Sequence, residues 1–190
     1  MRRNGYGMAE RARDDADLVT RAAAGDIGAF ESLVRAHADV VYAHAYRFFG
    51  DAQAAQDATQ EVWVKVFRSL EGFDSRAAFT TWLFRVTRNV CLDMLRSGRR
   101  AATPIDPVEL HGIANDDPAG EAVGAVDLET AMRALSPEDR EAFNAVALFG
   151  LPYIEAGSVL GVPAGTVKSR VFRARRALTT LLSLDAKGGA

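Results

Sequence analysis

The chain has 190 residues, of which 48% are hydrophobic and 25% charged, and its formal net charge is -2. This composition is ordinary for a globular protein with a real core, in one domain or two small ones. No stretch is apolar enough to span a bilayer and no signal segment opens the chain, so we expect a cytoplasmic protein without membrane insertion. The single cysteine, Cys91, excludes an internal disulfide and a multi-cysteine zinc site, and we expect it to be a small buried hydrophobe.

Helical spacing of apolar residues recurs along almost the whole chain, and no alternating β-branched run predicts a strand. We therefore predict an all-α fold. After a loose start, the pattern predicts a long helix ending near Gly50, a second from about 52 to 70, and a third from about 78 to 97. The apolar faces of these helices are marked by Phe30, Leu33, Val34, His37, Val40, Val41, Phe48, Ala58, Val62, Trp63, Val66, Phe67, Leu70, Phe79, Trp82, Leu83, Val86, Val90 and Met94.

A change of composition divides the chain into two small helical domains joined by a flexible linker. Residues 99–126 contain three prolines, several glycines and the acidic run NDDPAGE, without sustained periodicity. We predict an N-terminal domain over 17–98, the linker over 99–126, a C-terminal domain over 127–182 and a frayed tail. Within the second domain, SPED predicts a helix start with Ser136 as N-cap and Pro137 at the first helical position.

A basic segment without acids lies near the end of the chain. GVPAGTVKSRVFRARRALTTLL, residues 161–182, holds five cations, and subtracting them from the 23 lysines and arginines leaves 18 against 25 acidic residues. On a helical wheel an apolar stripe opposes a face of cations, a hydroxyl and one aromatic. The stripe consists of Val167, Val171, Ala174, Leu178, Leu181 and Leu182. The outward face consists of Lys168, Ser169, Phe172, Arg173 and Arg176, whereas Arg170 and Arg175 flank the stripe.

The residues before this segment predict a helix-turn-helix. PYIEAGSVL (152–160) forms a short helix, and Gly161, Val162 and Pro163 form a tight turn into the basic helix. In such a motif the second helix enters the major groove of DNA. A solvated basic face is the alternative interpretation, and the motif occurs in many regulators, so it does not name the function.

The helix near 78–97 carries a second basic stripe. Arg85, Arg88 and Arg96 share one side of the wheel, with Thr81 and Asn89 between them, and Arg99 and Arg100 extend it. A loop rich in small and polar residues precedes this helix, within LEGFDSRAAF (70–79). A cationic face beside aromatics and an adaptable loop suits single-stranded DNA, whose unpaired bases stack or enter pockets. Core aromatics under a solvated arginine face are the alternative interpretation.

Three blocks together resemble the bacterial sigma factors, specifically the compact extracytoplasmic-function (ECF) group. They are DATQEVWVKVF (57–67), FTTWLFRVTRNVCLDMLR (79–96) and SPEDREAFNAVALFGLPYIEAGSVLGVPAGTVKSRVFRARRAL (136–178), and the resemblance covers about residues 17 to 182. It implies a non-enzymatic protein without cofactor that binds core RNA polymerase, opens the minus-ten promoter element and reads the minus-thirty-five element as duplex. It also implies contacts with the clamp helices of the largest polymerase subunit and the flap of the second largest, and an anti-sigma factor as a further partner.

The resemblance assigns site residues block by block. The clamp contact corresponds to Asp57, Gln60 and Glu61, although a solvated polar face would give the same stripe. Minus-ten DNA corresponds to Phe73, Asp74, Ser75, Arg76, Arg85, Arg88, Asn89 and Arg96. Minus-thirty-five DNA corresponds to Lys168, Ser169, Phe172, Arg173 and Arg176. The 28 linker residues, as a free coil, are too short on average to separate two such elements, so we expect the polymerase-free protein to be the more compact form.

Two features qualify this interpretation. Where the family has a bulky aliphatic residue and then alanine, this chain has Ala156 and Gly157, so the first helix of the motif is either less stable or more closely packed. His37 and His44 lie seven residues apart, without carboxylates at metal-site spacing, and we expect surface or half-buried histidines rather than metal ligands.

The sequence leaves two competing functions open: a helix-turn-helix regulator that acts without polymerase and a metal-dependent helical-bundle enzyme.

Overall fold

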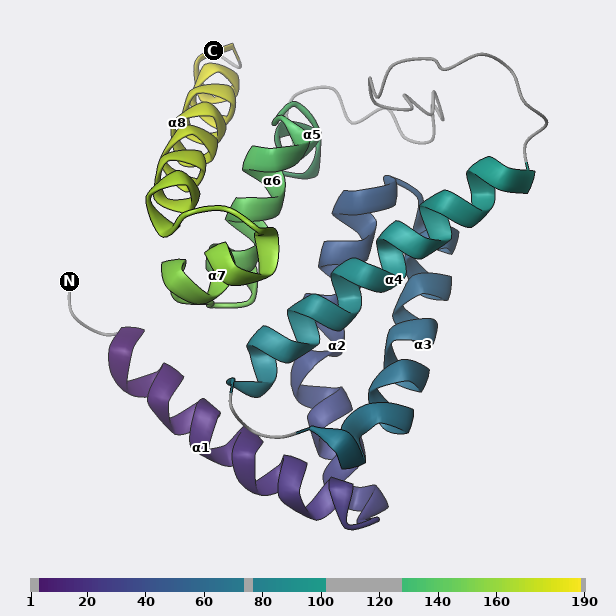
Figure 1. Ribbon diagram of the computed structural model, residues 1–190. Helices are drawn as coiled ribbons and strands as arrows, with labels where there is room; N and C mark the ends of the chain where they lie inside the picture. Colours follow the sequence, from purple (N-terminus) through teal and green to yellow (C-terminus); the bar gives the residue numbers. More distant parts are fainter. Residues whose placement is uncertain (1–3, 74–76, 102–127, 189–190) are drawn as a thin grey trace.

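The computed structural model describes residues 4–73, 77–101 and 128–188, and every regular element in these ranges is a helix (Figure 1). The predicted all-α class is therefore confirmed. Capping residues begin the helices at Ile27 and Ala52: the Asp26 and Asp51 carboxylates accept hydrogen bonds from the amides of Ala29 and Ala54. Gly50, at φ 71°, ends the first of these helices. The N-terminal helices are α1 (Asn4–Ala23), α2 (Ile27–Phe49), α3 (Ala52–Ser69), the 3₁₀ turn η1 (Leu70–Gly72) and α4 (Phe79–Ala101).

Helix α1 differs from the predicted loose start, and its contacts with α2 give the reason. Val19 is buried, and the Asp15 carboxylate lies 3.0 Å from Nε2 of His37, with both side chains largely shielded from solvent. The helix therefore gains its stability from a polar pair and a short apolar segment. Neither is visible as a long apolar stripe in the sequence.

The core of the N-terminal helices agrees with the predicted apolar faces in most positions. Leu33, Val41, Val62, Val66 and Leu83 are fully buried, and the free thiol of Cys91 is buried as expected. The expectation that Phe67 belongs to the core is wrong, because its side chain is 61% exposed. Phe67 instead packs across the edge of the Phe30 ring, 5.1 Å between ring centroids.

In the C-terminal domain the predicted start of one helix is confirmed, whereas the end of the last helix differs from the prediction. Ser136 caps α6 through its hydroxyl, which accepts a hydrogen bond from the Asp139 amide, and Pro137 takes the first helical position as predicted. The predicted frayed tail is helical as far as Gly188. Leu182 is 38% exposed rather than inward. The helices are α5 (Leu128–Arg133), α6 (Pro137–Phe143), the π-turn η2 (Asn144–Leu148), α7 (Tyr153–Leu160) and α8 (Ala164–Gly188).

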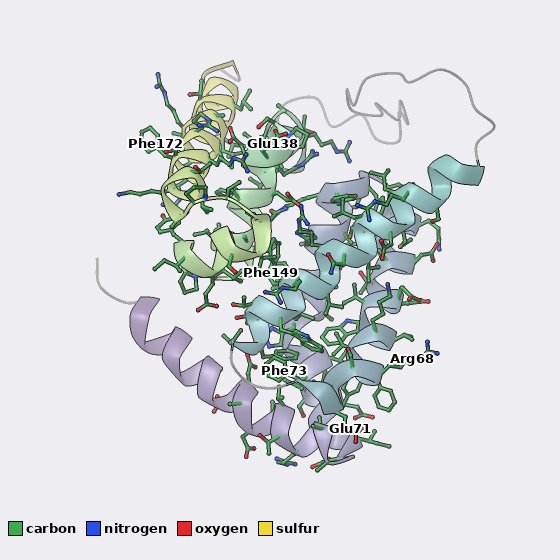
Figure 2. The ribbon with its side chains drawn as sticks, in the orientation of Figure 1. Arg68, Glu71, Phe73, Glu138, Phe149 and Phe172 are labelled. Carbon is green, nitrogen blue, oxygen red and sulfur yellow. The ribbon has the colours of Figure 1, made fainter. Side chains whose placement is uncertain are left out.

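The two domains pack directly against each other, with α7 beside α4 (Figure 1). Phe149 and Leu151 from the C-terminal domain are buried in the same cluster as Phe84 and Cys91 of α4. Figure 2 shows Phe149 directed into the body of the molecule between the two sets of helices. Helix α4 continues to Ala101, past the expected domain boundary at 98, and the rest of the predicted linker lies outside the described residues.

Candidate DNA and polymerase interfaces

Helices α7 and α8 form the predicted helix-turn-helix. Gly161 closes α7 with φ 69°, and Val162 donates its amide to the Gly157 carbonyl, 3.0 Å from N to O. A Cβ added to Gly157 would lie 2.6 Å from the Val162 carbonyl oxygen, closer than side chains approach backbone. Of the two expectations for the small residues here, the structure therefore shows the close packing, and Gly157 lets α7 approach the turn.

The outward face of α8 presents the residues that the sequence predicts for duplex DNA. Lys168, Ser169, Phe172, Arg173 and Arg176 are exposed, while Val167, Val171 and Ala174 are buried on the opposite side. Phe172 is 67% exposed and points away from the protein in Figure 2. Cations beside an exposed ring can contact phosphates and base edges in the major groove.

Arg173 differs from its neighbours because it already has a partner within the domain. Its Nε donates to Asp139 Oδ2 at 3.0 Å and its Nη2 donates to Asp139 Oδ1 at 2.6 Å. This hydrogen-bonded pair raises the pKa of the Arg173 guanidinium. The carboxylate lies in the capped first turn of α6, so the pair ties α8 to that helix.

The basic face of α4 is divided between exposed and covered residues. Arg85, Asn89 and Arg96 are exposed, and Arg96 pairs with Asp93 on its own helix. Arg88, by contrast, is only 25% exposed. Its Nε donates to Oε1 of Glu141 at 2.5 Å, from α6 of the other domain.

Thr81, about two turns before Arg88 on the same face, is covered by the same domain. Its hydroxyl donates to the Glu155 carboxylate of α7, and Thr81 is buried. Sequence reasoning did not find Glu141 or Glu155 as partners of this face. At the start of the loop before α4, the Phe73 ring contacts the rings of Phe79 and Trp82 at centroid distances of 6.3 and 5.1 Å. The predicted Asp74, Ser75 and Arg76 lie outside the described residues.

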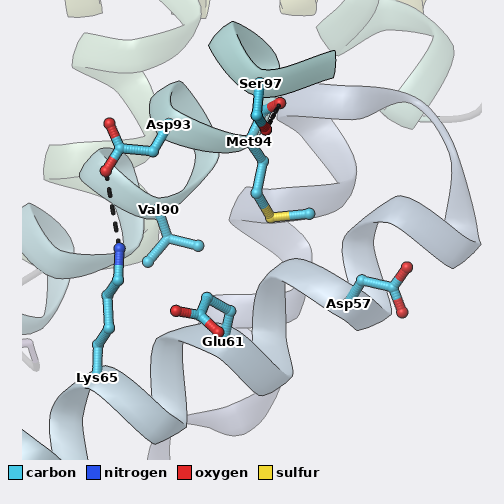
Figure 3. Close-up of a pocket in the computed structure, with 7 residues that line it drawn as sticks. All are labelled: Asp57, Glu61, Lys65, Val90, Asp93, Met94 and Ser97. Carbon is cyan, nitrogen blue, oxygen red and sulfur yellow. Dashed lines mark hydrogen bonds and ion pairs between the residues drawn. The ribbon is translucent and has the colours of Figure 1, made fainter. Parts of the chain in front are cut away.

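The predicted clamp contact borders a groove between α3 and α4 (Figure 3). The groove has a volume of about 460 Å³, with Asp57, Glu61 and Asp93 around apolar Val90 and Met94. Lys65 is the cation in its wall, and its Nζ lies 3.7 Å from the Asp93 carboxylate. Gln60 is exposed next to it on α3. An exposed acidic rim over an apolar floor suits a basic, amphipathic helix.

Comparison with known families accounts for both domains. The model of sigma-70 region 2 matches residues 33–101, and that of sigma-70 region 4 matches residues 125–178. The chain is 36% identical to the ECF RNA polymerase sigma factor SigM of Mycobacterium tuberculosis, over 90% of this chain and 85% of SigM. The chain belongs to the ECF RNA polymerase sigma factors. Like other sigma factors it is a non-catalytic, DNA-binding protein of transcription initiation.

Other sigma factors are similar to this chain in sequence or in structure. SigE of Mycolicibacterium smegmatis is 40% identical over 81% of this chain, which spans 62% of the length of SigE. Among solved structures, CnrH in complex with the cytosolic domain of CnrY gives a TM-score of 0.63 at 26% identity, over 90% of this chain and 99% of CnrH. RpoE of Bartonella quintana in complex with the anti-sigma factor NepR gives a TM-score of 0.62 at 26% identity, over 82% of this chain and 98% of RpoE. None of the helices in the described ranges combines the length and apolar character of a membrane span.

Proposed function

We propose that this sigma factor binds core RNA polymerase in the cytoplasm and directs it to promoters that it reads at two elements. The observation that supports the proposal is that one chain exposes basic residues on two helices, α4 and α8. A helix-turn-helix regulator that works alone needs only the second face. The first is suited to the unpaired strand that forms when a promoter opens.

The polymerase contact lies at the α3–α4 groove in this proposal. Asp57 and Glu61 line the groove and Gln60 lies beside them on α3; all three are exposed, so they reach a partner without any change in the fold. The clamp helices of the largest subunit are the partner that the family resemblance implies. Exposed carboxylates here increase the association rate with a basic surface more than they stabilise the free protein.

The minus-ten contact involves the exposed Arg85, Asn89 and Arg96 together with Phe73 and the predicted loop residues after it. Arg88 joins this set only when Glu141 releases it, since the free protein holds that guanidinium in an ion pair. Bases that leave the duplex stack on or enter the protein, and each stacked base contributes about 1–3 kcal/mol toward opening.

The minus-thirty-five contact belongs to α8. Lys168, Ser169, Phe172 and Arg176 are exposed on the side that faces away from the domain core, and we assign base and phosphate contacts to them. We assign Arg173 a double role: its pair with Asp139 engages Nε and Nη2, and the remaining nitrogen, Nη1, is the one we assign to DNA. The flap of the second largest polymerase subunit is the expected partner of this domain.

An anti-sigma factor completes the proposed set of partners. CnrH and RpoE, which share this fold at 26% identity, were solved with the cytosolic domain of CnrY and with NepR. We expect a protein of that kind to bind this chain and compete with polymerase.

Assembly with core RNA polymerase tests the proposed function. The chain is mixed with purified core enzyme and separated by size exclusion, with and without promoter-containing DNA. We expect a stoichiometric complex before DNA is added. Duplex DNA binding by the chain alone, with no association with core enzyme, would instead indicate the regulator that acts without polymerase.

A further inference from the structure

His44 of α2 is a buried imidazole with no hydrogen-bond partner among the described residues. It is 1% exposed, and neither Nδ1 nor Nε2 has a partner. The sequence predicted a surface or half-buried histidine at this position, so this prediction is wrong. A polar ring buried without hydrogen bonds loses stability relative to an apolar ring of similar size, and therefore needs an explanation.

The ring lies at the boundary between the two sigma regions. Its neighbours are the rings of Phe48 and Phe84 from region 2 and Phe149 from region 4, at centroid distances of 6.5, 5.4 and 5.7 Å. Phe84 and Phe149 also contact each other at 5.1 Å. Phe149 follows the π-turn η2 and covers the imidazole from the region 4 side. Separation of the two regions removes this cover.

The charged groups around His44 are mostly cationic. Arg47 of α2, Arg88 of α4 and Arg140 of α6 all disfavour a proton on the ring, and the carboxylate of Glu141 on α6 is paired with Arg88. Burial first, and these guanidinium groups second, lower the pKa of His44 from 6.5 to about 3. The η2 segment, which contributes Asn144 as acceptor for Nη1 of Arg47, adds no charge of its own. The closed arrangement therefore accommodates only the neutral imidazole.

We propose that His44 makes the closed arrangement of regions 2 and 4 a proton-sensitive latch, which opens when the imidazole takes up a proton. When Phe149 moves away, the ring meets water and regains an ordinary affinity for protons. Because the closed form disfavours the proton, closure is fully stabilised above the ordinary histidine pKa of 6.5 and is lost progressively as the pH falls below it. Each pH unit in that window reduces the closed-to-open ratio by up to about tenfold.

The latch controls the minus-ten face of α4. The same closure that covers His44 holds Arg88 against Glu141 and Thr81 against Glu155. Opening releases both side chains toward a nucleic-acid strand. This consequence rests on the proposed function, whereas opening itself is a property of the free chain.

Small-angle X-ray scattering of the full chain between about pH 8 and about pH 5 tests the latch. We expect the radius of gyration to increase as the pH falls, with circular dichroism showing unchanged helix content. His44→Leu fills the site with a group that does not titrate, so it should remain compact throughout. His37→Gln, which alters the other histidine of α2, should keep the wild-type transition. Phe149→Ala should already be open at the higher pH.

Identical scattering curves for the wild type and His44→Leu would overturn the proposal, as would a wild type that stays compact. If His44→Leu loses helix content, NMR titration of the imidazole protons of the wild type takes the place of that variant as the measurement. Titration of His44 together with the change in size supports the latch, and a size change without titration overturns it. Neither polymerase nor DNA is present, so failure of the proposed function leaves these results unaffected.

Discussion

Arg88 of α4 and Glu141 of α6 form an ion pair across the two sigma regions, with Nε and Oε1 2.5 Å apart. Both side chains are about three-quarters shielded from solvent, so the pair is more than a surface contact. It joins a residue that the resemblance to sigma factors assigns to promoter DNA with an acid of region 4. The closed arrangement thus occupies part of the surface that we propose for the minus-ten contact.

Glu141→Ala should shift the free chain toward the open form. Hydrogen bonds to charged groups contribute about 1.5–3 kcal/mol, so we expect about a ten- to hundredfold larger open fraction. Burial raises the pKa of the Cys91 thiol to about 12 in the closed form, where Glu141 lies near it. The rate at which a thiol reagent modifies this one cysteine should therefore increase.

Glu138→Ala is the matched control for that experiment. Glu138 lies one turn earlier on α6 and is exposed, so its removal should leave the modification rate unchanged. Equal rates for the Glu141 and Glu138 variants would show that the ion pair does not hold the regions together.

Asp57→Ala combined with Glu61→Ala should weaken binding to core RNA polymerase while leaving the melting temperature almost unchanged. Both carboxylates lie on the exposed rim of the α3–α4 groove and support no buried contact. Titration of labelled core enzyme provides the affinity. The control removes the same charge elsewhere, through Glu31→Ala with Glu71→Ala, both exposed in the free chain. Equal losses in the two double variants would exclude the groove as a specific contact.

Gly157→Ala should destabilise region 4, although alanine is the better helix former by about 1 kcal/mol. The new Cβ would lie 2.6 Å from the Val162 carbonyl oxygen, and such overpacking costs about 1–3 kcal/mol. Chemical denaturation measures the difference. Gly165→Ala in α8 is the control, since its Cβ would meet nothing within 4 Å and should be neutral or stabilising. A more stable Gly157→Ala variant would contradict the close approach of α7 to the turn.

Arg173→Ala and Arg176→Ala should have different effects although both residues are exposed. Loss of Arg173 leaves the Asp139 carboxylate unpaired, so we expect a lower melting temperature together with weaker binding to all promoters. Loss of Arg176 should keep the melting temperature and relax the preference at particular minus-thirty-five positions, by about 1–3 kcal/mol of discrimination. Holoenzyme binding to single-base variants of a promoter separates the two. Uniform weakening by Arg176→Ala would mean that this residue contacts phosphate only.

Local signals in the sequence were sufficient for most helices and for the outer face of α8. The cap at Ser136 and the glycine at 161 act within a few residues, so the structure reproduces them. Phe84, however, belongs to a second buried stripe on α4, with Thr87 and Cys91, and all three are fully buried. A helix with two apolar sides needs two packing partners, and this was the available signal that α4 is covered from both sides.

The features that could not be predicted from the sequence depend on contacts between distant segments of the chain. The burial of His44 requires Phe149, which lies 105 positions further along the chain. The partners of Arg88 and Thr81 likewise come from another domain, and exposed acids such as Glu141 and Glu155 give no periodic pattern of their own. Helical periodicity identifies which residues share a face, but not which face meets another domain.

Run-off transcription tests the central claim most directly. Core RNA polymerase with this chain is given templates in which both promoter elements are randomised, and the transcribed templates are sequenced. We predict transcripts from templates that share one minus-ten and one minus-thirty-five sequence, and loss of the minus-thirty-five preference alone in Arg176→Ala. Transcription that does not depend on the chain, or enrichment of a single element only, would contradict a sigma factor that reads promoters with both α4 and α8.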